Sequence, residues 1–226
     1  MESIYQGKTK DLLQDGERYF FKFKDDMTGT ADGEFDTGGN QVAGSMAGAG
    51  QECLKVSEFF FKKIAEAGIA TAFVDANLSE NLMEIKKAQV FGQGLEVITR
   101  FVAVGSFVRR YGAYVEEGTS LPAYTEMTLK DDKREDPLAT KEGLAVLGVM
   151  TPEEYDIIAE KNRQAAEIVK SILAERGLEL YDIKFEWGKD EEENILLIDE
   201  VSGGNMRVYQ DGHYIKPLDL SKAMGL

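Results

Sequence analysis

Residues 180–200, LYDIKFEWGKDEEENILLIDE, constrain the fold more than any other part of the chain. From residue 182 to residue 187, charged and apolar side chains alternate strictly, a period of two that is typical of a β-strand with one face in the core. The charged positions are Asp182, Lys184 and Glu186, and the apolar positions are Ile183, Phe185 and Trp187. The apolar run ILLI follows at residues 195–198, so the stretch predicts two strands joined by a turn.

A hairpin through this turn would bring Asp199 across from Glu186 or close to it. Converging carboxylates repel, and a hard cation such as Mg²⁺, held by one or two carboxylates and by substrate phosphates, would relieve the repulsion. A solvated ribbon whose charges bind nothing is the alternative, and the pattern alone does not decide between the two. The acids of the turn, residues 190–193, are expected to be solvated.

The charge balance limits the classes of function. The chain has 26 Lys and Arg against 41 Asp and Glu, a formal net charge of −15, which argues against binding to a nucleic-acid backbone. A few local lysines and a divalent cation can still hold a nucleotide. The single cysteine, Cys53, excludes an intrachain disulfide, and the single histidine, His213, disfavours histidine-based zinc sites and a Ser/His/Asp triad. Any catalysis is therefore expected to use carboxylates, lysines and arginines.

The sequence contains neither a leader-like apolar segment at its start nor a run of about 18 apolar residues. We therefore expect a cytoplasmic protein with small-molecule substrates, no nucleic-acid partner and no membrane partner. A homodimer is one oligomeric state that the sequence leaves open.

Hydrophobic periodicity predicts the other main elements. Strands are expected at residues 17–24, 71–75, 81–86 and 95–102, and a helix is expected from about residue 51 to Gly68. Thr151 and Glu154 have capping-box spacing at the start of a long helix that should end before Gly177. Residues 38–50 are rich in glycine and predict a mobile loop, for which closure over the site is a hypothesis.

Two segments carry basic residues in patterns that suit phosphate groups. In YQGKTK, Gly7 precedes Lys8 and Lys10, which could follow a polyphosphate if the segment is extended. In TRFVAVGSFVRR, Arg100 lies on the predicted strand, and Gly105 and Ser106 lie at the start of a helix, where free N–H groups favour an anion. Arg109 and Arg110 follow, either as part of this monophosphate site or as surface charges.

Seven segments in this order resemble the SAICAR synthetase family of purine biosynthesis. The segments span residues 5–209 and are YQGKTK, FKDD, FFFKKIAEAGI, VITRFVAVGSFVRRYG with EEGTSL, KDDKREDPLAT, RGLELYDIKFEWG and LLIDEVSGGNMRVY. The resemblance implies an α+β, two-domain SAICAR-synthetase-like fold related to ATP-grasp ligases, with antiparallel sheets and packed helices. It places a smaller nucleotide-binding domain at residues 1–94 and a larger domain with the metal, ATP and ribotide sites at residues 95–226.

The resemblance also implies an activity with ATP and Mg²⁺ as cofactors. The family joins aspartate to the carboxylate of carboxyaminoimidazole ribotide through an acyl phosphate, giving SAICAR, ADP and phosphate. A related ligase with a different amine or acid, and a nucleotide-binding module without catalysis, are the alternatives.

The resemblance assigns roles to individual residues. Lys8 and Lys10 would lie on the ATP phosphates, Glu186 and Asp199 would bind Mg²⁺ beside ATP, and Lys86 or Lys87 would approach the nucleotide. Asp26 would face the imidazole carboxylate and the metal, and Lys184 would orient the nucleotide. The ribose phosphate would be held by Arg100, Ser106 and Arg207.

Three departures from the family pattern concern the acceptor side. Cys53-Leu54 replaces an Asn pair, and Ser202-Gly203-Gly204 replaces Ser-Pro-Asp, which removes a carboxylate. The long C-terminal helix of the family is also missing from the sequence.

Overall fold

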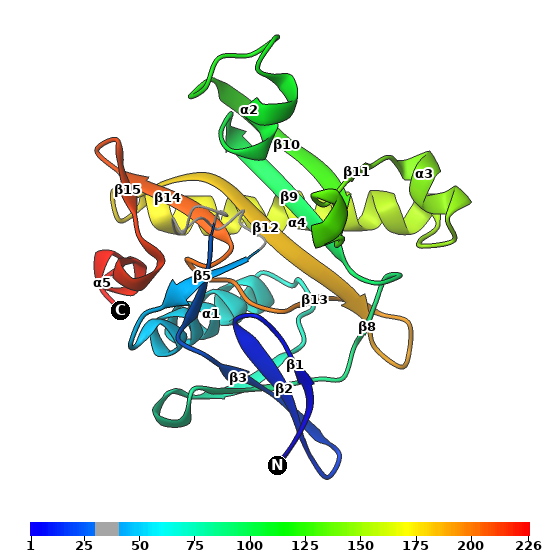
Figure 1. Ribbon diagram of the computed structural model, residues 1–226, viewed down its shortest axis with the longest axis vertical. Helices are drawn as coiled ribbons and strands as arrows, with labels where there is room; N and C mark the ends of the chain where they lie inside the picture. The colour runs from blue at the N-terminus through cyan, green and yellow to red at the C-terminus, as the bar shows by residue number, and fades with distance from the viewer. Residues whose placement is uncertain (30–40) are drawn as a thin grey trace.

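The computed structural model describes residues 1–29 and 41–226. Two antiparallel sheets with helices packed against them form the molecule, which confirms the predicted α+β class (Figure 1). A small third sheet pairs β4 (Asp26–Gly29) with β5 (Gln41–Ser45).

The five-stranded sheet is built from the first part of the chain, and N-terminal strands β1–β3 form its protruding edge (Figure 1). Its order is β1 (Glu2–Gln6), β2 (Lys10–Asp15), β3 (Arg18–Phe23), β7 (Leu82–Ile85) and β6 (Phe73–Asn77). The strands predicted at residues 17–24, 71–75 and 81–86 are thus confirmed within a few residues. The two strands on either side of YQGKTK were not predicted.

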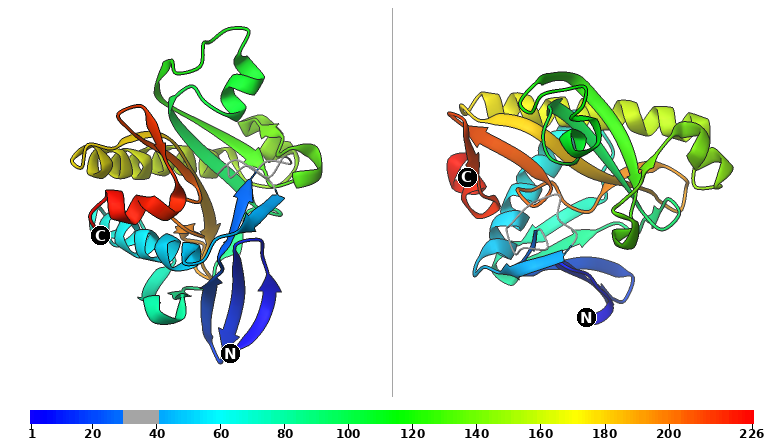
Figure 2. Two further views of the ribbon diagram at one scale, coloured as in Figure 1. Left: turned by 60° about the vertical axis from the view of Figure 1, so that its left-hand side comes forward. Right: turned by 45° about the horizontal axis from the view of Figure 1, so that its top comes forward.

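The eight-stranded sheet comes from the rest of the chain, and Figure 2 shows it from two further directions. Its main order is β11 (Leu138–Ala139), β10 (Ser120–Leu129), β9 (Leu95–Val102), β12 (Glu179–Lys189), β14 (Met206–Gln210) and β15 (His213–Ile215). Two short strands, β8 (Gln89–Val90) and β13 (Ile195–Ile198), also pair with β12. β12 therefore has strand partners along its whole length, and the hairpin predicted from the acidic stretch is confirmed.

Helices pack on these sheets, and they are α1 (Ala49–Glu66), α2 (Ser106–Tyr111), α3 (Lys141–Val146), α4 (Pro152–Ala174) and α5 (Leu220–Ala223). Three short 3₁₀ turns are η1 (Leu78–Glu80), η2 (Asp132–Arg134) and η3 (Pro217–Asp219). The predicted capping box of α4 is present, since Glu154 N donates to Thr151 Oγ1 at 3.2 Å and Thr151 N donates to Glu154 Oε2 at 2.7 Å.

Most of the described part of the glycine-rich segment is strand or helix, and only residues 46–48 form a turn. Residues 41–45 pair with β4, and α1 begins at Ala49. The expectation of a loop is therefore wrong for residues 41–45 and 49–50, because strand pairing and helix formation satisfy the backbone there. Residues 38–40, and with them part of the hypothesis of closure, lie outside the described residues.

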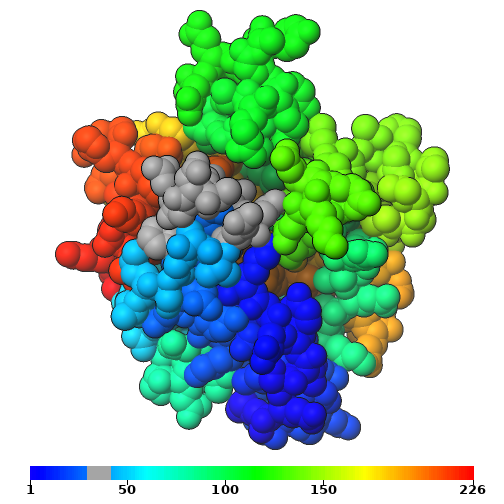
Figure 3. Space-filling view, in the orientation of Figure 1, coloured from blue at the N-terminus to red at the C-terminus, as the bar shows by residue number. Residues whose placement is uncertain are grey.

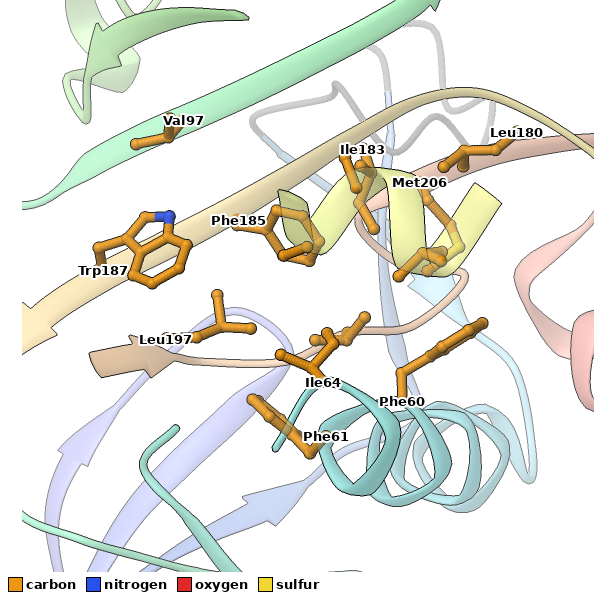
Figure 4. Close-up of a cluster of buried hydrophobic side chains, with 14 of the residues drawn as sticks. Phe60, Phe61, Ile64, Val97, Leu180, Ile183, Phe185, Trp187, Leu197 and Met206 are labelled. Atoms are coloured by element: carbon orange, nitrogen blue, oxygen red, sulfur yellow. The ribbon is translucent and has the colours of Figure 1, made fainter. Parts of the chain in front are cut away.

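The core lies between the eight-stranded sheet and helices α1 and α4, and Figure 4 shows the part of it next to α1. The apolar face of β12, with Ile183, Phe185 and Trp187, points toward Phe60 and Ile64 of α1. One cluster of buried side chains takes members from both large sheets, for example Phe23 and Met83 from the smaller and Val97 and Val208 from the larger. The domain boundary between residues 94 and 95 stays a prediction. In the described part of the chain, no helix is long and apolar enough to cross a membrane.

Candidate functional site: a lysine and carboxylate pocket beside an arginine cluster

A pocket of about 400 Å³ opens between the N-terminal hairpin and the eight-stranded sheet. Figure 3 shows the hollow between the N-terminal strands and the segment around η2, with β12 at its floor. The charged side chains that line it are Lys8, Lys10, Lys24, Asp26, Glu96, Lys130, Asp132, Lys184, Glu186, Asp199 and Glu200. Five lysines facing six carboxylates make this pocket suited to a phosphorylated, metal-dependent ligand.

The strand period of β12 aims Lys184 and Glu186 at the pocket while the alternate residues fill the core. Glu186 lies opposite Ile198 in β13, so Asp199 follows one residue later. Asp199 has a φ of 66°, in the left-handed region that non-glycine residues seldom adopt. The hairpin brings Asp199 near Glu186, as expected, and an unusual backbone conformation accompanies its position.

Glu186 and Asp199 influence each other's ionisation. Burial and the neighbouring Asp199 raise the pKa of Glu186 above its usual range, although Lys130 opposes the shift. Burial would also raise the pKa of Asp199, but Lys10 and Lys130 outweigh it, and the pKa is lowered. The two carboxylates are therefore close and are held within reach of cations.

Lys10 is the buried cation of the pocket, with 8% of its side chain exposed. Its Nζ lies 3.3 Å from Asp199 Oδ1 and also contacts the carboxylate of Glu200. Burial alone would lower its pKa, but these two acids raise it. Ser202 Oγ donates to the other oxygen of Glu200. Two carboxylates thus hold the ammonium group of Lys10 in place.

The other predicted lysines also have carboxylate partners. Lys184 Nζ lies 2.7 Å from Glu96 Oε1, and Lys8 Nζ lies 2.5 Å from Asp132 Oδ2 across the pocket. Burial would lower the pKa of Lys184, but Glu96 raises it. Lys8 lies in the bend between β1 and β2, whereas Lys10 begins β2, so the two do not lie on one extended segment as expected.

Asp26 lies at the pocket, whereas the two lysines after β7 lie outside it. Asp26 lines the pocket, with Oδ2 3.8 Å from Lys24 Nζ. Lys86 and Lys87 are not among the lining residues, and Lys87 pairs with Glu191 at 3.2 Å. The structure therefore does not bring Lys86 or Lys87 to the pocket.

Sequence reasoning missed Glu96, Lys130 and Glu200. Lys130 Nζ lies 2.7 Å from Glu186 Oε1, and its side chain crosses Gly94, where a Cβ atom would come within 2.8 Å of Lys130 Cδ. The segment KDDKREDPLAT, which contributed to the family resemblance, begins just after Leu129 and was the signal that could have identified Lys130. The long strand β10, which carries Lys130 just after its end, was not predicted.

The residues predicted to hold a ribose phosphate do come together, on the same polar face of the sheet. Arg100 Nη2 donates to Ser106 Oγ at 2.7 Å, and Arg100 Nη1 and Arg207 Nη1 lie 2.7 and 2.8 Å from Asp182 Oδ2. Gly105 has a φ of 57°, and a Cβ there would be 2.8 Å from Arg207 Nη2, so only glycine allows this approach. Asp182 precedes Lys184 and Glu186 on one face of β12, which places this cluster along the strand from the pocket.

In the residues described, no group of three or more His, Cys, Asp or Glu side chains is arranged to hold a metal ion. Mg²⁺ in nucleotide sites takes only one or two carboxylates and completes its shell with water and phosphate oxygens. The oxygen donors of Glu186 and Asp199 fit that pattern.

Comparison with known proteins agrees with the geometry. The family model described as SAICAR synthetase matches residues 3–223. A Clostridium tetani protein named phosphoribosylaminoimidazole-succinocarboxamide synthase is 52% identical over 225 residues, covering 98% of each chain. Among solved structures, a SAICAR synthetase in complex with ADP superposes with a TM-score of 0.84 at 29% identity, covering 97% of this chain and 93% of the other. The SAICAR synthetase of Pyrococcus horikoshii gives a TM-score of 0.81 at 28% identity, covering 95% and 93%. The chain belongs to the SAICAR synthetase family of enzymes.

Proposed function

We propose that this enzyme is the ATP-dependent ligase that joins aspartate to carboxyaminoimidazole ribotide in purine biosynthesis, giving SAICAR, ADP and phosphate. Family membership, the 52% identical relative and the ADP complex of a solved relative support this activity. The observation that carries the proposal is the polar face of β12. One strand places Lys184 and Glu186 in the lysine and carboxylate pocket, and Asp182 in the arginine cluster.

In this proposal the pocket binds ATP. Lys8 and Lys10 lie at the turn where the N-terminal hairpin covers the pocket, and their ammonium groups would neutralise the phosphates. Lys130 joins them as a third cation. All three pair with carboxylates, and phosphate oxygens would compete for these lysines.

Glu186 and Asp199 would hold Mg²⁺, since both offer carboxylate oxygens in one pocket and are close enough to alter each other's pKa. When bound there, Mg²⁺ would neutralise negative charge that develops on the transferred phosphoryl group. The same carboxylates contact Lys130 and Lys10, so the ion would share their oxygens with these two lysines.

The ribotide would bind with its phosphate at Arg100, Ser106 and Arg207, and with its carboxylate toward Asp26 and Lys184. β12 rises about 3.3 Å per residue, so two residues separate the phosphate cluster from the pocket by about 7 Å.

The reaction divides into two steps because a carboxylate is a poor electrophile. A carboxylate oxygen of the ribotide attacks the γ-phosphorus of ATP, the bond to the β-phosphate oxygen breaks, and ADP leaves. The amine of aspartate then attacks the acyl carbon, phosphate leaves, and a carbon–nitrogen bond forms with loss of a proton from the amine. The lysines stabilise the negative charge on the transferred phosphoryl group, and Lys184 and Asp26 orient the reacting groups.

The direct test is ADP release with ATP, Mg²⁺, ribotide and aspartate, with product identified by mass. We expect turnover that requires all four, and a Glu186→Gln variant whose activity falls at least about 100-fold and whose affinity for ADP no longer responds to Mg²⁺. Glu191→Gln is the matched control, because it makes the same change on the exposed turn of the same hairpin.

Three results would contradict the proposal. A wide preference for another amine would indicate a related ligase, and ADP binding without turnover would indicate a nucleotide-binding module. If Mg²⁺ changes the ADP affinity of Glu186→Gln as much as that of the parent, Glu186 is not a Mg²⁺ ligand.

The homodimer and the cytoplasmic location stay predictions. Analytical ultracentrifugation at micromolar concentrations tests the first, and cell fractionation tests the second.

A further inference from the structure

Five side chains form a chain of alternating charges across the arginine cluster, in the order Arg110, Glu126, Arg100, Asp182 and Arg207. Glu126 Oε1 accepts from Arg100 Nε at 2.9 Å and also contacts Arg110 Nη2. Asp182 Oδ2 joins Arg100 to Arg207 at 2.7 and 2.8 Å. Only 1% of the Arg100 side chain is exposed, against 27% for Arg110 and 14% for Arg207. The two ends of the chain thus reach solvent, whereas its centre is buried.

Arg109 and Arg110 are neighbours on α2, and the sequence left both open as anion ligands or surface charges. The structure separates them. The guanidinium of Arg110 contacts the same carboxylate oxygen as that of Arg100, which in turn holds Ser106. Arg109 is exposed, and within residues 1–29 and 41–226 no ion pair of Arg109 is found.

We propose that Arg110 is a further substrate-binding residue that contacts the phosphate of the ribotide together with Ser106 and Arg207. This inference rests on the proposed function, because it assumes that the arginine cluster is the phosphate site. Among the described residues, three arginines and two carboxylates form the cluster, and Arg110 adds one positive charge at its exposed end. Removal of that charge lowers the attraction for a phosphate monoester.

Arg110 can turn from Glu126 to a ligand without leaving that carboxylate unpaired. Two nitrogens of Arg100, Nε and Nη2, lie 2.9 and 2.8 Å from Glu126 Oε1 and remain there. The second oxygen, Oε2, is buried and has no hydrogen-bond partner among the described residues. Both arginines therefore converge on one oxygen, and the contact of Arg110 is the more exposed and the more easily exchanged.

The test compares Arg110→Ala with Arg109→Ala, which removes the same charge from the adjacent position of the same helix. Calorimetry with ribose 5-phosphate, and the KM values for ribotide and ATP in the full enzyme, are the readouts. We expect Arg110→Ala to weaken ribose 5-phosphate binding and to raise the KM for ribotide about tenfold, with the KM for ATP unchanged. Arg109→Ala should change each value less than about twofold, and Arg110→Lys should fall between Arg110→Ala and the parent, because it keeps the charge but loses the planar fork.

Arg207→Ala distinguishes an error in the role of Arg110 from an error in the position of the phosphate site. If Arg207→Ala weakens ribose 5-phosphate binding but Arg110→Ala behaves like Arg109→Ala, the inference about Arg110 is wrong and the proposed function stands. If neither Arg207→Ala nor Arg110→Ala changes binding, the phosphate site itself is misplaced. A parallel rise in the KM for ATP in Arg110→Ala would indicate a general structural effect and would also overturn the inference.

Discussion

Replacing Lys10 by methionine tests the ion pair at the centre of the pocket. The change keeps much of the side-chain volume but leaves Glu200, a carboxylate that is 6% exposed, without its cation. Removal of one partner of a buried ion pair costs about 3–5 kcal/mol, because the remaining charge stays desolvated. For a chain of this size, 1 kcal/mol corresponds to about 2–4 °C in Tm, so we expect Tm to fall by about 6–20 °C.

The double variant Lys10→Met/Glu200→Gln separates stability from binding. It removes both charges, and the amide oxygen that replaces the carboxylate of Glu200 can still accept from Ser202 Oγ, so most of the lost free energy of unfolding should return. Nucleotide affinity should not return, because the ammonium group that we propose contacts the phosphates is still missing. Lys62→Met is the control, since Lys62 forms an exposed pair with Glu58 and should cost less than about 0.5 kcal/mol.

Urea unfolding followed by the fluorescence of Trp187, the single tryptophan, gives the free energies, and calorimetry with ADP gives the affinities. A loss below about 1 kcal/mol in Lys10→Met would refute the reasoning, because such a value is typical of solvent-screened pairs. Equal nucleotide affinity in the double variant and the parent would refute the role assigned to Lys10.

Two further predictions concern the departures from the family pattern. Gly203→Ala should destabilise the protein by about 1–3 kcal/mol in thermal unfolding, because a Cβ at position 203 would lie 2.5 Å from Pro217 Cα and the C-terminal segment would have to move. The control, Gly143→Ala on α3, should have almost no effect on stability. Equal losses of stability in the two variants would contradict the role of packing at Gly203. Burial raises the pKa of Cys53 from its ordinary value of 9.0 to about 12, so the native protein should react slowly with thiol reagents at pH 8. Since the folded pKa lies above the unfolded one, the contribution of this thiol to stability is intact below pH 9 and is lost as the pH rises toward 12. The free energy of unfolding of the parent should therefore fall more steeply above pH 9 than that of Cys53→Ala, and identical slopes would disprove the shift.

The structure also shows how the departures relate to one another. Cys53, Glu200 and Gly204 line one pocket, and Ser202 Oγ accepts from Gly204 N at 2.9 Å, so the positions that differ from the family pattern are neighbours in the fold. Pro217 fills the space beside Gly203. The C-terminal segment therefore covers one of the altered positions, and Gly204 and Cys53 line the pocket itself.

Local patterns in the sequence were sufficient to predict several elements. Alternation in residues 182–187 predicted which side chains of β12 enter the core and which face the site, and the capping box predicted the start of α4. These predictions succeeded because the period of two and the cap depend on neighbours within a few residues. The family resemblance added the fold and the activity, through motifs distributed along the chain.

Which charged side chains meet depends on the three-dimensional fold. Lys130 reaches Glu186 across 56 positions, Lys10 reaches Glu200 across 190, and Arg110 rather than Arg109 reaches Glu126. No local period encodes such pairs, because sheet order and register bring them together, and a shift of one residue in β9 or β10 would point each side chain to the opposite face. For the same reason Lys86 and Lys87, plausible from sequence position, are not brought to the pocket, whereas Lys130 is.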